Sequence, residues 1–504
     1  MGERVRIVSG PTEQVVIVGA GLSGLSAALR LVAAGRSVTL LERESVPGGR
    51  AGVCRAKGYT FDTGPTVLTM PDLIADAFDC VGEHMADWLT LRRLDPAYRV
   101  RFADGSTLDV RAHPQDTAAE IAALCGPAEA QRYHRLVDWL TRLYRCQMRS
   151  FIDRNLDSPL ALLNPDLARL VAAGGFGRLA PAIDARLSDP RLRRVFSFQS
   201  MYAGLAPAEA LACYAVISYM DTVAGVWFPD GGLHALPTAL AAAAVKHGAD
   251  VRYDTEVVGV DRAAGRAVAV RTAAGERVPC DALVLTVDRP VAVERLLGRR
   301  PRRRLRYSPS CALLLAGAPA AGPHRAHHEV VFGNAWERTF AEIIDRGRLM
   351  SDESFLVSTA SRTDASLAPA GRDAHTVLFP TPNLTGHQDW AVLRGGYRDH
   401  MLRVLAERGY PEFAAEAEVI DLVTPADWAA RGMAAGTPFA AAHTFRQTGP
   451  FRPANLARDW ANVVFAGSGT VPGVGIPSVL ISGRLAAERI TGPDRIYRSR
   501  AWPL

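Results

Sequence analysis

Short apolar runs and helical periodicity alternate at the start of the chain. Residues 14–19, QVVIVG, form a β-branched run that ends in glycine, as buried parallel strands do. GLSGLSAALRLVAAG follows with leucines at helical spacing, and Gly35 is placed to end that helix as its C-cap. SVTLLER then has the pattern of a second strand. This order predicts a β-α-β unit at the N-terminus.

The remaining pattern changes along the chain. Residues from about 70 to 230 have mainly helical patterning, as in AEAQRYHRLVDWLTRLYRCQM. Residues 249–287 indicate a strand, a hairpin and a buried strand, and residues from about 300 to 430 mix strands and helices between many Pro and Gly breaks. NVVFAGSG predicts a late strand that enters a glycine turn before a final helix.

The turn after the first strand carries the motif Gly19-Ala20-Gly21-Leu22-Ser23-Gly24. This spacing permits a tight turn, close approach of the backbone to a pyrophosphate and close packing of helix on strand. The helix N-terminus adds unpaired N–H groups that favour phosphate. Glu42 lies about 20 residues on, where a carboxylate accepts hydrogen bonds from ribose hydroxyls. A plain glycine-rich turn is the alternative, but the combination favours dinucleotide binding, with NAD and FAD both open.

A second backbone-rich stretch follows Glu42. VPGGRAGVCRAKGYTFDTGPTV contains Gly48, Gly49 and Arg50, where a simple NAD domain would continue to another crossover helix. A loop with one planar, permanently charged guanidinium suits the pyrophosphate of a longer cofactor. The alternative is a surface turn with an incidental arginine.

Composition limits the class of protein. The chain has 504 residues, of which 48% are hydrophobic and 22% charged, so we expect a globular protein with more than one domain. No apolar run reaches the roughly 18–20 residues that span a bilayer, and the charged start shows no signal peptide. The seven cysteines lack any metal-ligand spacing, so we expect reduced thiols, no metal site and a cytoplasmic location.

The net charge is +6, and part of the excess lies in RRPRRRLR, residues 299–306. One interpretation is a solvated loop, and a second is contact with anionic lipid headgroups. No nucleic-acid-binding motif accompanies the charge, so we expect no nucleic-acid partner.

Seven motifs together resemble the bacterial phytoene desaturases, FAD-dependent carotenoid desaturases related to amine oxidases and protoporphyrinogen oxidases. They are VVIVGAGLSGLSAALRL, LLERESVPGGRAG, GYTFDTGPTV, FSFQSMYAG, GVWFPDGG, PFRPANL and AGSGTVPGVGIPSV. The resemblance implies an α/β fold in which a discontinuous Rossmann-like FAD-binding domain is interleaved with an α+β substrate and membrane-associating domain. The implied FAD-binding segments are 1–95, 236–295 and 431–504; the substrate domain comprises 96–235, mainly helical, and 296–430, of mixed sheet and helices.

The resemblance also implies where FAD binds. The Gly473–Val479 loop would let backbone lie against the isoalloxazine, and the helix starting near Pro477 would aim its N–H groups at the N1/O2 edge. The implied cofactor-binding residues are Gly19, Ala20, Gly21, Gly24, Glu42, Arg43, Gly48, Gly49, Arg50, Gly64, Pro65, Thr66, Val257, Gly467, Gly469, Gly475, Ile476 and Pro477.

The implied reaction introduces successive double bonds into phytoene, towards lycopene, by hydride transfer to flavin N5 followed by proton loss. Aromatic faces would stabilise positive charge on the polyene. The candidates near the ring are Phe196, Phe198, Tyr202, Trp227 and Phe228, with core packing as the alternative. Asp153 and Arg154, in SFIDRN, are the catalytic candidates, with an ordinary solvated pair as the alternative.

The implied partners are phytoene, partly desaturated carotenoids and oxygen or a quinone as electron acceptor. A substrate that lives in lipid implies peripheral attachment of the cytoplasmic protein to the membrane surface, and a homo-oligomer stays open. The alternatives within the resemblance are a 3,4-desaturase, a diapophytoene desaturase, a terminal methyl oxidase or an isomerase. A non-catalytic prenyl-lipid-binding protein of the same fold is more distant, because such proteins tend to lose the cofactor motif that is intact here.

Overall fold

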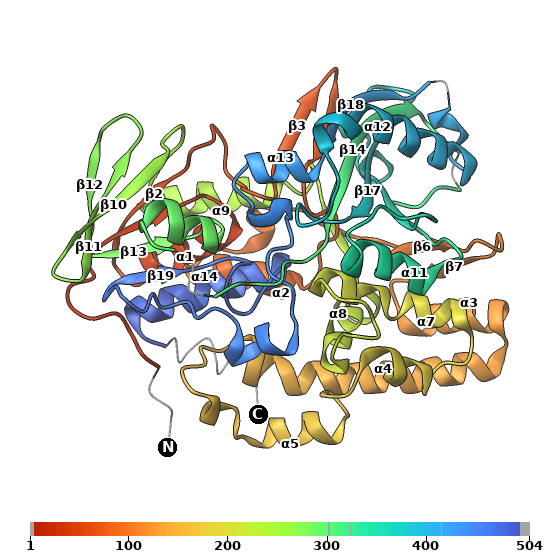
Figure 1. The fold of residues 1–504 in the computed structure, drawn as a ribbon, viewed down its shortest axis with the longest axis horizontal. Coiled ribbons are helices and arrows are strands. Elements are labelled where there is room, and N and C mark those ends of the chain that lie inside the picture. Colours follow the sequence, from red (N-terminus) through yellow and green to blue (C-terminus); the bar gives the residue numbers. More distant parts are fainter. Residues whose placement is uncertain (1–4, 301–302, 323, 415, 494–504) are drawn as a thin grey trace.

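The structure is a computed structural model that describes residues 5–300, 303–322, 324–414 and 416–493. Pro301 and Arg302 of the basic run lie outside the described residues. Figure 1 shows a parallel-sheet part on the left, a second sheet at the upper right and a group of helices at the lower right.

The parallel sheet contains the first strand of the sequence. Its order is β19-β13-β1-β2-β9, and every neighbouring pair is parallel. The strands are β1 (Gln14–Val18), β2 (Ser37–Leu41), β9 (Asp250–Arg252), β13 (Ala282–Leu285) and β19 (Val463–Phe465). Strands from three distant stretches of the chain thus form the Rossmann-like α/β sheet that the sequence predicted. The exact domain limits stay a prediction.

The two faces of this sheet have different covers. Val15 and Ile17 pack in one core with the helices, and Val16 and Val18 pack in another core with an antiparallel sheet. This explains why the strand is apolar on both faces. The helices are α1 (Leu22–Ala33), α9 (Ala235–Lys246) and α14 (Ile476–Thr491); the antiparallel strands are β10 (Val257–Ala263), β11 (Arg266–Thr272) and β12 (Arg277–Pro279).

A seven-stranded sheet forms the second part, in the order β18-β14-β17-β16-β15-β6-β7. Its pairs are antiparallel except β15 with β6. The strands are β6 (Tyr98–Arg101), β7 (Thr107–Val110), β14 (Ser310–Pro319), β15 (His328–Val331), β16 (Phe355–Thr359), β17 (Arg372–Thr381) and β18 (Glu418–Val423). The helix α12 (Trp390–Glu407) buries Trp390, Tyr397 and Met401 in one core with this sheet.

Helices fill the region between residues 114 and 219. They are α3 (Pro114–Cys125), α4 (Pro127–Gln147), α5 (Pro165–Ala172), α6 (Leu179–Asp184), α7 (Pro190–Val195) and α8 (Ala215–Tyr219). Proline begins α3, α4, α5 and α7, where its missing N–H costs no helical hydrogen bond. Figure 1 shows α4 along the lower edge, with α5 beneath it. The remaining named elements are α2 (Pro71–Asp79), α10 (Arg289–Val291), α11 (Trp336–Phe340), α13 (Pro425–Ala430), β3 (Val53–Ala56), β4 (Tyr59–Asp62), β5 (Leu91–Arg93) and β8 (Trp227–Pro229).

The prediction of mainly helical structure from about 70 to 230 is wrong between residues 91 and 110, where β5, β6 and β7 lie. In β6, buried Tyr98 and Val100 alternate with half-buried arginines, but this period-two signal lasts only four residues. The strand is completed by pairing with β15, from a distant part of the chain. Such a long-range partner is absent from the local pattern.

Across the described ranges, no helix combines the length and the apolar character needed to cross a bilayer.

Candidate cofactor and substrate site

The turn between β1 and α1 has no room for side chains at two of its glycines. Gly19 has φ +107°, and a Cβ there would overlap with the Thr286 hydroxyl. A Cβ on Gly24 would overlap with the carbonyl oxygen of Gly19. The first glycine therefore serves the turn, and the last allows α1 to begin directly against it.

Gly21 has a different surrounding. It is the N-cap of α1, no side chain caps that helix, and the first turn has no acidic residue. A Cβ on Gly21 would find its nearest neighbour, the Gly48 carbonyl oxygen, at 3.9 Å. The uncapped N–H groups at the start of α1 are thus left to a ligand, and an anion is the ligand that they favour.

The loop that follows Glu42 lies directly on this turn. Gly48 forms an isolated parallel bridge with Gly21, and a Cβ on Gly49 would lie 3.3 Å from the Gly21 Cα. A Cβ on Gly64 would overlap with the Arg50 carbonyl oxygen. Both glycine stretches of the N-terminal hundred residues are therefore packed backbone to backbone, which is the physical reason for their composition.

Arg50 connects this loop to the C-terminal glycines. Its Nη1 donates to the Ser468 hydroxyl at 2.6 Å, and its Nη2 lies 3.9 Å from an Asp288 carboxylate oxygen. Its Nε is buried and has no hydrogen-bond partner among the described residues. A guanidinium with an unused donor beside an uncapped helix start suits an anionic ligand.

Glu42 is buried at the end of β2. One carboxylate oxygen accepts from the Ala20 N–H at 2.6 Å and the other from the Glu44 N–H at 3.0 Å. Each oxygen keeps a second acceptor site, which a ribose hydroxyl can use. Arg43 is exposed and donates to the Arg431 carbonyl at 2.8 Å, and Val257 begins β10 nearby, since the Thr255 N–H donates to the Glu42 carbonyl.

The C-terminal glycine stretch is the third segment of the candidate cofactor site, after the β1–α1 turn and the Gly48–Arg50 loop. Gly467 follows β19 with φ +101°, and its N–H donates to the Ser482 hydroxyl of α14 at 3.0 Å. A Cβ on Gly469 would lie 2.9 Å from the Arg289 Cβ. Gly475 differs from these: it is exposed, has φ +109°, and a Cβ there would have no atom within 4 Å. Gly475 therefore borders open space at the start of α14.

The start of α14 resembles that of α1. Gly475 is its N-cap, no side-chain cap is present, and the buried residues Ile476 and Pro477 begin the helix. The sequence predicted this helix start and the strand before it, and both are confirmed. The uncapped starts of α1 and α14, the unused Arg50 donor and the space at Gly475 together fit the FAD implied by the sequence resemblance.

Arg452 holds the C-terminal glycine stretch in place, a role that its motif PFRPANL did not indicate. The side chain is buried and donates to the Thr470 carbonyl at 2.8 Å and to the Ser468 carbonyl at 2.6 Å. Burial lowers the pKa of Arg452 to about 10. The signal was a lone arginine between an aromatic residue and a proline, which gives no indication of carbonyl partners.

Asp62 stood out in the stretch after Glu42, but its sequence gave it no individual role. It is buried and accepts from the N–H groups of Leu233 and His234 at 3.0 and 3.2 Å. The His234 Nε2 lies 2.8 Å from the Pro47 carbonyl, so this nitrogen carries the proton. Burial raises the pKa of Asp62 to about 6. The motifs GYTFDTG and GVWFPDGG are thus clamped together beside the Gly48 loop.

The predicted substrate aromatics occupy different surroundings. Phe196 is fully buried against Tyr133, with ring centroids 5.3 Å apart. Phe198 is half-buried and meets Tyr202 edge to face at 5.9 Å. In β8, Phe228 packs against His327 at 4.5 Å, and Trp227 donates its backbone N–H to Leu68, two residues after Thr66. Their contact with substrate stays a prediction; Phe196 has the surroundings of a core residue.

Asp153 lies buried and forms an ion pair with Arg484 of α14, which also pairs with Glu488 at 2.5 Å. Asn155 donates to the Leu485 carbonyl at 3.0 Å. The interpretation of Asp153 as a solvated group is therefore wrong, because the carboxylate is enclosed between the helical region and α14. The catalytic roles of Asp153 and Arg154 stay a prediction, and the contacts of Asp153 assign it a part in packing.

A second buried carboxylate, Asp221, lies beside the aromatic residues. It belongs to a π-helical turn, Met220–Ala224, and faces the hydroxyls of Tyr98 and Tyr202. Within the described part of the chain, no hydrogen bond of normal geometry reaches Asp221 Oδ2 or the Tyr98 hydroxyl, although both are buried. Burial raises the pKa of Asp221 to about 7. No motif pointed to this residue, because its burial depends on β6.

A polar chain connects the surroundings of Asp221 to the predicted cofactor loop. The Ser358 hydroxyl donates to the Thr66 hydroxyl at 3.0 Å and lies 2.9 Å from His328 Nδ1. The His328 ring lies 5.7 Å from that of Tyr98. Burial holds the pKa of His328 well below its ordinary value, so the imidazole is neutral. Neutral polar groups thus extend from Thr66 to the carboxylate.

Comparison with known proteins agrees with this geometry. A family model described as flavin containing amine oxidoreductase matches residues 22–491. The chain is 58% identical over 497 residues to a phytoene dehydrogenase from Streptomyces griseus, covering 98% of this chain and 97% of that protein. It is 36% identical over 485 residues to a zeta-carotene-forming phytoene desaturase from Myxococcus xanthus, covering 95% and 93% of the two chains. A solved oxidoreductase structure from Methanosarcina mazei, 16% identical, shares the fold with a TM-score of 0.59 over 94% of this chain and 99% of that one.

Proposed function

Because the chain belongs to the flavin containing amine oxidoreductase family, we propose that it is an FAD-dependent phytoene desaturase of carotenoid biosynthesis. Its cofactor is FAD, and it is an oxidoreductase. The proposed substrate is phytoene, which receives successive double bonds towards lycopene. The observation that carries the proposal is the meeting of three distant glycine loops, through the Gly21–Gly48 bridge and the Arg50–Ser468 hydrogen bond, in a chain related over nearly its whole length to the Streptomyces griseus protein.

The cofactor residues divide the binding task between them. The uncapped start of α1 and the Arg50 guanidinium would hold the pyrophosphate, because both present donors that no described residue uses. Glu42 would accept from ribose hydroxyls. The start of α14, beside the space at Gly475, would present N–H groups to the ring edge on which negative charge develops.

When bound, FAD supplies a two-electron acceptor that takes a hydride from an allylic carbon of the substrate. The chain's own task is to hold an apolar polyene in a dry space and to remove the proton that must leave with the hydride. Phe198, Tyr202 and Phe228 offer aromatic faces that stabilise positive charge without a nucleophile that would trap it.

We assign proton removal to Asp221 in preference to Asp153. The Asp153 carboxylate is already paired with Arg484, whereas Asp221 has a buried oxygen without a hydrogen-bond partner among the described residues. A pKa of about 7 leaves the Asp221 carboxylate partly deprotonated at neutral pH and basic enough to accept a proton. Tyr98 lies next to it and would steady the carboxylate by hydrogen bonding once the side chains adjust.

The electron acceptor and the cellular site are proposed from the chemistry of the substrate. Each new double bond releases one hydride and one proton from the polyene, so an external oxidant must accept the two electrons. Oxygen or a membrane quinone would take this role. A substrate dissolved in lipid requires a protein that reaches the bilayer surface, and we propose peripheral attachment from the cytoplasmic side.

Purified FAD-loaded protein, supplied with phytoene in liposomes and a quinone, tests the function. Chromatography should show products with longer conjugated chains that absorb at longer wavelength. Unchanged phytoene would refute the proposed substrate. Lycopene, neurosporene and diapophytoene, offered separately, would then distinguish a 3,4-desaturase, a diapophytoene desaturase, an oxidase and an isomerase. A flavin-free protein that binds prenyl lipid would identify the non-catalytic alternative.

A further inference from the structure

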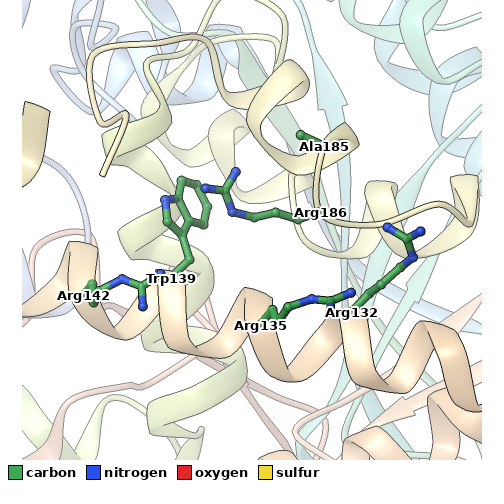
Figure 2. Close-up of a pocket in the computed structure, with 6 residues that line it drawn as sticks. All are labelled: Arg132, Arg135, Trp139, Arg142, Ala185 and Arg186. Carbon is green, nitrogen blue, oxygen red and sulfur yellow. The ribbon is translucent and has the colours of Figure 1, made fainter. Parts of the chain in front are cut away.

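Arginines form a stripe along α4, far from the glycine loops. Arg132, Arg135, Trp139 and Arg142 follow one another at intervals of three and four residues, which places them on one face of the helix. Figure 2 shows Arg186 reaching towards Trp139 from the segment above α4. Its guanidinium carbon lies 4.0 Å from the centre of the indole ring. The stripe and Arg186 together enclose a hollow.

This hollow has a neighbour that shares three of its lining residues, and we call the two together the arginine cleft. One end, of about 350 Å³, is lined by Arg132, Arg135, Trp139, Arg142, Ala185 and Arg186. The other end, of about 580 Å³, shares Trp139, Arg142 and Arg186 and extends along α4 towards α5. Arg145, Arg149 and Arg169 join its lining there, with Asp166 as the one carboxylate among the lining residues. The cleft therefore combines one indole with a strong excess of guanidinium groups.

Arg186 donates to the Ala182 carbonyl at 2.6 Å, but few of the cleft arginines have a carboxylate partner. Asp166 pairs with Arg169 at 2.7 Å and lies 3.6 Å from Arg149. Among the described residues, no carboxylate lies within 4.0 Å of the guanidinium nitrogens of the other cleft arginines except at Arg132, which is 3.8 Å from Glu129. Burial and the nearby Arg142 lower the pKa of Arg186. Clustered like charges of this kind are stabilised by an external anion.

An exposed apolar edge adjoins the cleft. Leu160 and Leu163 are 73% and 71% exposed, and Val171 and Phe176 are 59% and 45% exposed. Val171 and Phe176 flank Ala172 and Ala173, which line the cleft, and the Trp139 indole donates to the Ala173 carbonyl at 2.8 Å. Leu160 and Leu163 come just before α5, which runs beneath α4 in Figure 1. Neighbouring exposed leucines and a phenylalanine next to a basic cleft form an amphipathic surface.

We propose that the arginine cleft and this apolar edge dock the protein on an anionic phospholipid bilayer. Headgroup phosphates would enter the cleft, where arginines bind them, while Leu160 and Leu163 enter the boundary of the acyl chains. This inference rests on the proposed function in one respect, since a substrate dissolved in lipid gives the docking its purpose. The leucines favour a bilayer over nucleic acid, which would contact the arginines alone.

The basic run that stood out in the sequence is less suited to this role. Arg299 lies 3.4 Å from an Asp459 carboxylate oxygen, Arg303 donates to the Phe451 carbonyl at 2.9 Å, and Arg306 pairs with Glu209 at 3.1 Å. Much of its charge is therefore used inside the molecule. The exposed arginines of this neighbourhood provide the matched control.

Flotation of the FAD-loaded protein with vesicles tests the docking surface. We expect the wild type to float with vesicles that contain phosphatidylglycerol and to remain behind with phosphatidylcholine alone, and binding should weaken as salt rises. The triple variant Arg135→Gln/Arg142→Gln/Arg145→Gln should lower the partition coefficient by about 100-fold. Leu160→Ser/Leu163→Ser should lower it by about tenfold or more while preserving the charge.

Control variants remove the same features elsewhere. Arg295→Gln/Arg300→Gln/Arg304→Gln deletes three exposed arginines, two in the basic run and one just before it, and Val245→Ser/Val392→Ser deletes two exposed apolar side chains. Both should float like the wild type. An equal loss of flotation in the control and cleft arginine variants would show that binding depends on net charge alone and would overturn the proposal.

Two further outcomes would also overturn it. Binding to a DNA duplex with loss of vesicle flotation would assign the cleft to nucleic acid, and equal displacement by 10-fold excess inorganic phosphate and by phosphatidylglycerol vesicles would assign it to a free anion. FAD absorbance reports folding in every variant. Flotation requires no turnover, so a protein that docks but leaves phytoene unchanged would refute the proposed substrate and keep the docking surface.

Discussion

Gly475 combines left-handed backbone, exposure and free space at the start of α14. We predict that Gly475→Val lowers the FAD content of the purified protein at least tenfold. The new side chain meets no protein atom, so its cost to folding is limited to backbone strain of about 1–3 kcal/mol at φ 109° and ψ 151°. It would occupy the space that the cofactor ring needs. Absorbance of bound flavin per mole of protein and the thermal midpoint provide the measurement.

Gly275 offers a control that also has positive φ and free space at its Cβ. It lies in the turn between β11 and β12, has φ +85°, and a Cβ there would also have no atom within 4 Å. Gly275→Val should therefore lower the thermal midpoint to a similar extent and retain FAD. Equal flavin loss in both variants would show that strain alone is responsible.

Asp221 should control the pH dependence of desaturation. A base with a pKa of about 7 acts in its deprotonated form, so turnover should rise with pH through this value. Asp221→Asn should lower turnover by about 100-fold or more and abolish the rise, while FAD content stays constant. Turnover of saturating phytoene between pH 5 and 9 is the measurement.

Asp153→Asn distinguishes the two buried carboxylates. Because Arg484 keeps its ion pair with Glu488, the loss of this partner should destabilise the fold by about 1–3 kcal/mol, but the folded fraction should keep the wild-type pH profile. A profile that disappears in Asp153→Asn and persists in Asp221→Asn would reverse the assignment.

The Asp221 carboxylate should also make the free energy of unfolding depend on pH. The folded-state pKa of Asp221 is raised from 3.8 to about 7, so the folded protein binds this proton more tightly than the unfolded chain. The free energy of unfolding should consequently fall as pH rises from about 4 to about 7, by at most about 4 kcal/mol. Asp62 adds a smaller fall up to about pH 6. Asp221→Asn should remove the larger part, measured by urea unfolding at each pH.

The β1–α1 turn separates packing from ligand binding. Gly24→Ala would place a methyl group against the Gly19 carbonyl, so we predict a loss of about 1–3 kcal/mol of stability. Gly21→Ala has ordinary backbone angles and no neighbour closer than 3.9 Å, so its stability should stay within about 0.5 kcal/mol of wild type. Its methyl group should nevertheless weaken FAD binding, because this is where the backbone approaches the pyrophosphate.

Urea unfolding of the apoprotein and titration with FAD measure the two effects separately. A Gly21→Ala protein with wild-type affinity would contradict the placement of the pyrophosphate. A Gly24→Ala protein of unchanged stability would show that α1 can shift without cost.

Elements defined by neighbouring residues were predictable from the sequence. The strand, glycine turn and helix around Gly19–Gly24 are present as expected, as are β19 and α14. Their signals are local, since a turn without room for side chains requires glycines close together in the sequence. β6 is the counterexample, because four residues of alternation become a strand only through pairing with β15.

The same distinction applies to the site. Arg50 was predictable because it directly follows two glycines, whereas Arg452 and Asp221 are single charged residues in ordinary surroundings. Arg452 acquires its role from carbonyls at 468 and 470, and Asp221 from a tyrosine on β6. Burial of a charged group by distant segments leaves no mark in the neighbouring sequence.

On the scale of the complete fold, FAD should act as a link between distant segments. We predict that cofactor binding slows amide hydrogen exchange together in residues 19–24, 48–66 and 467–479, because one ligand contacts all three loops. Exchange in α12 should change little, since this helix packs on the other sheet. Mass spectrometry of apo and FAD-loaded protein provides the comparison, and protection confined to residues 19–24 would contradict the shared site.

The contact between α1 and α14 also has a consequence during synthesis. The Ser26 hydroxyl of α1 donates to the Leu480 carbonyl at 2.8 Å, across 454 positions of the chain. During translation, the face of α1 that packs on α14 therefore stays uncovered until residues 476–491 have been made. FAD cannot stabilise a chain that ends before β19, because that chain lacks the C-terminal glycine stretch of the proposed site. Stable cofactor binding is therefore expected only after the C-terminal residues have been translated and α14 has packed on α1.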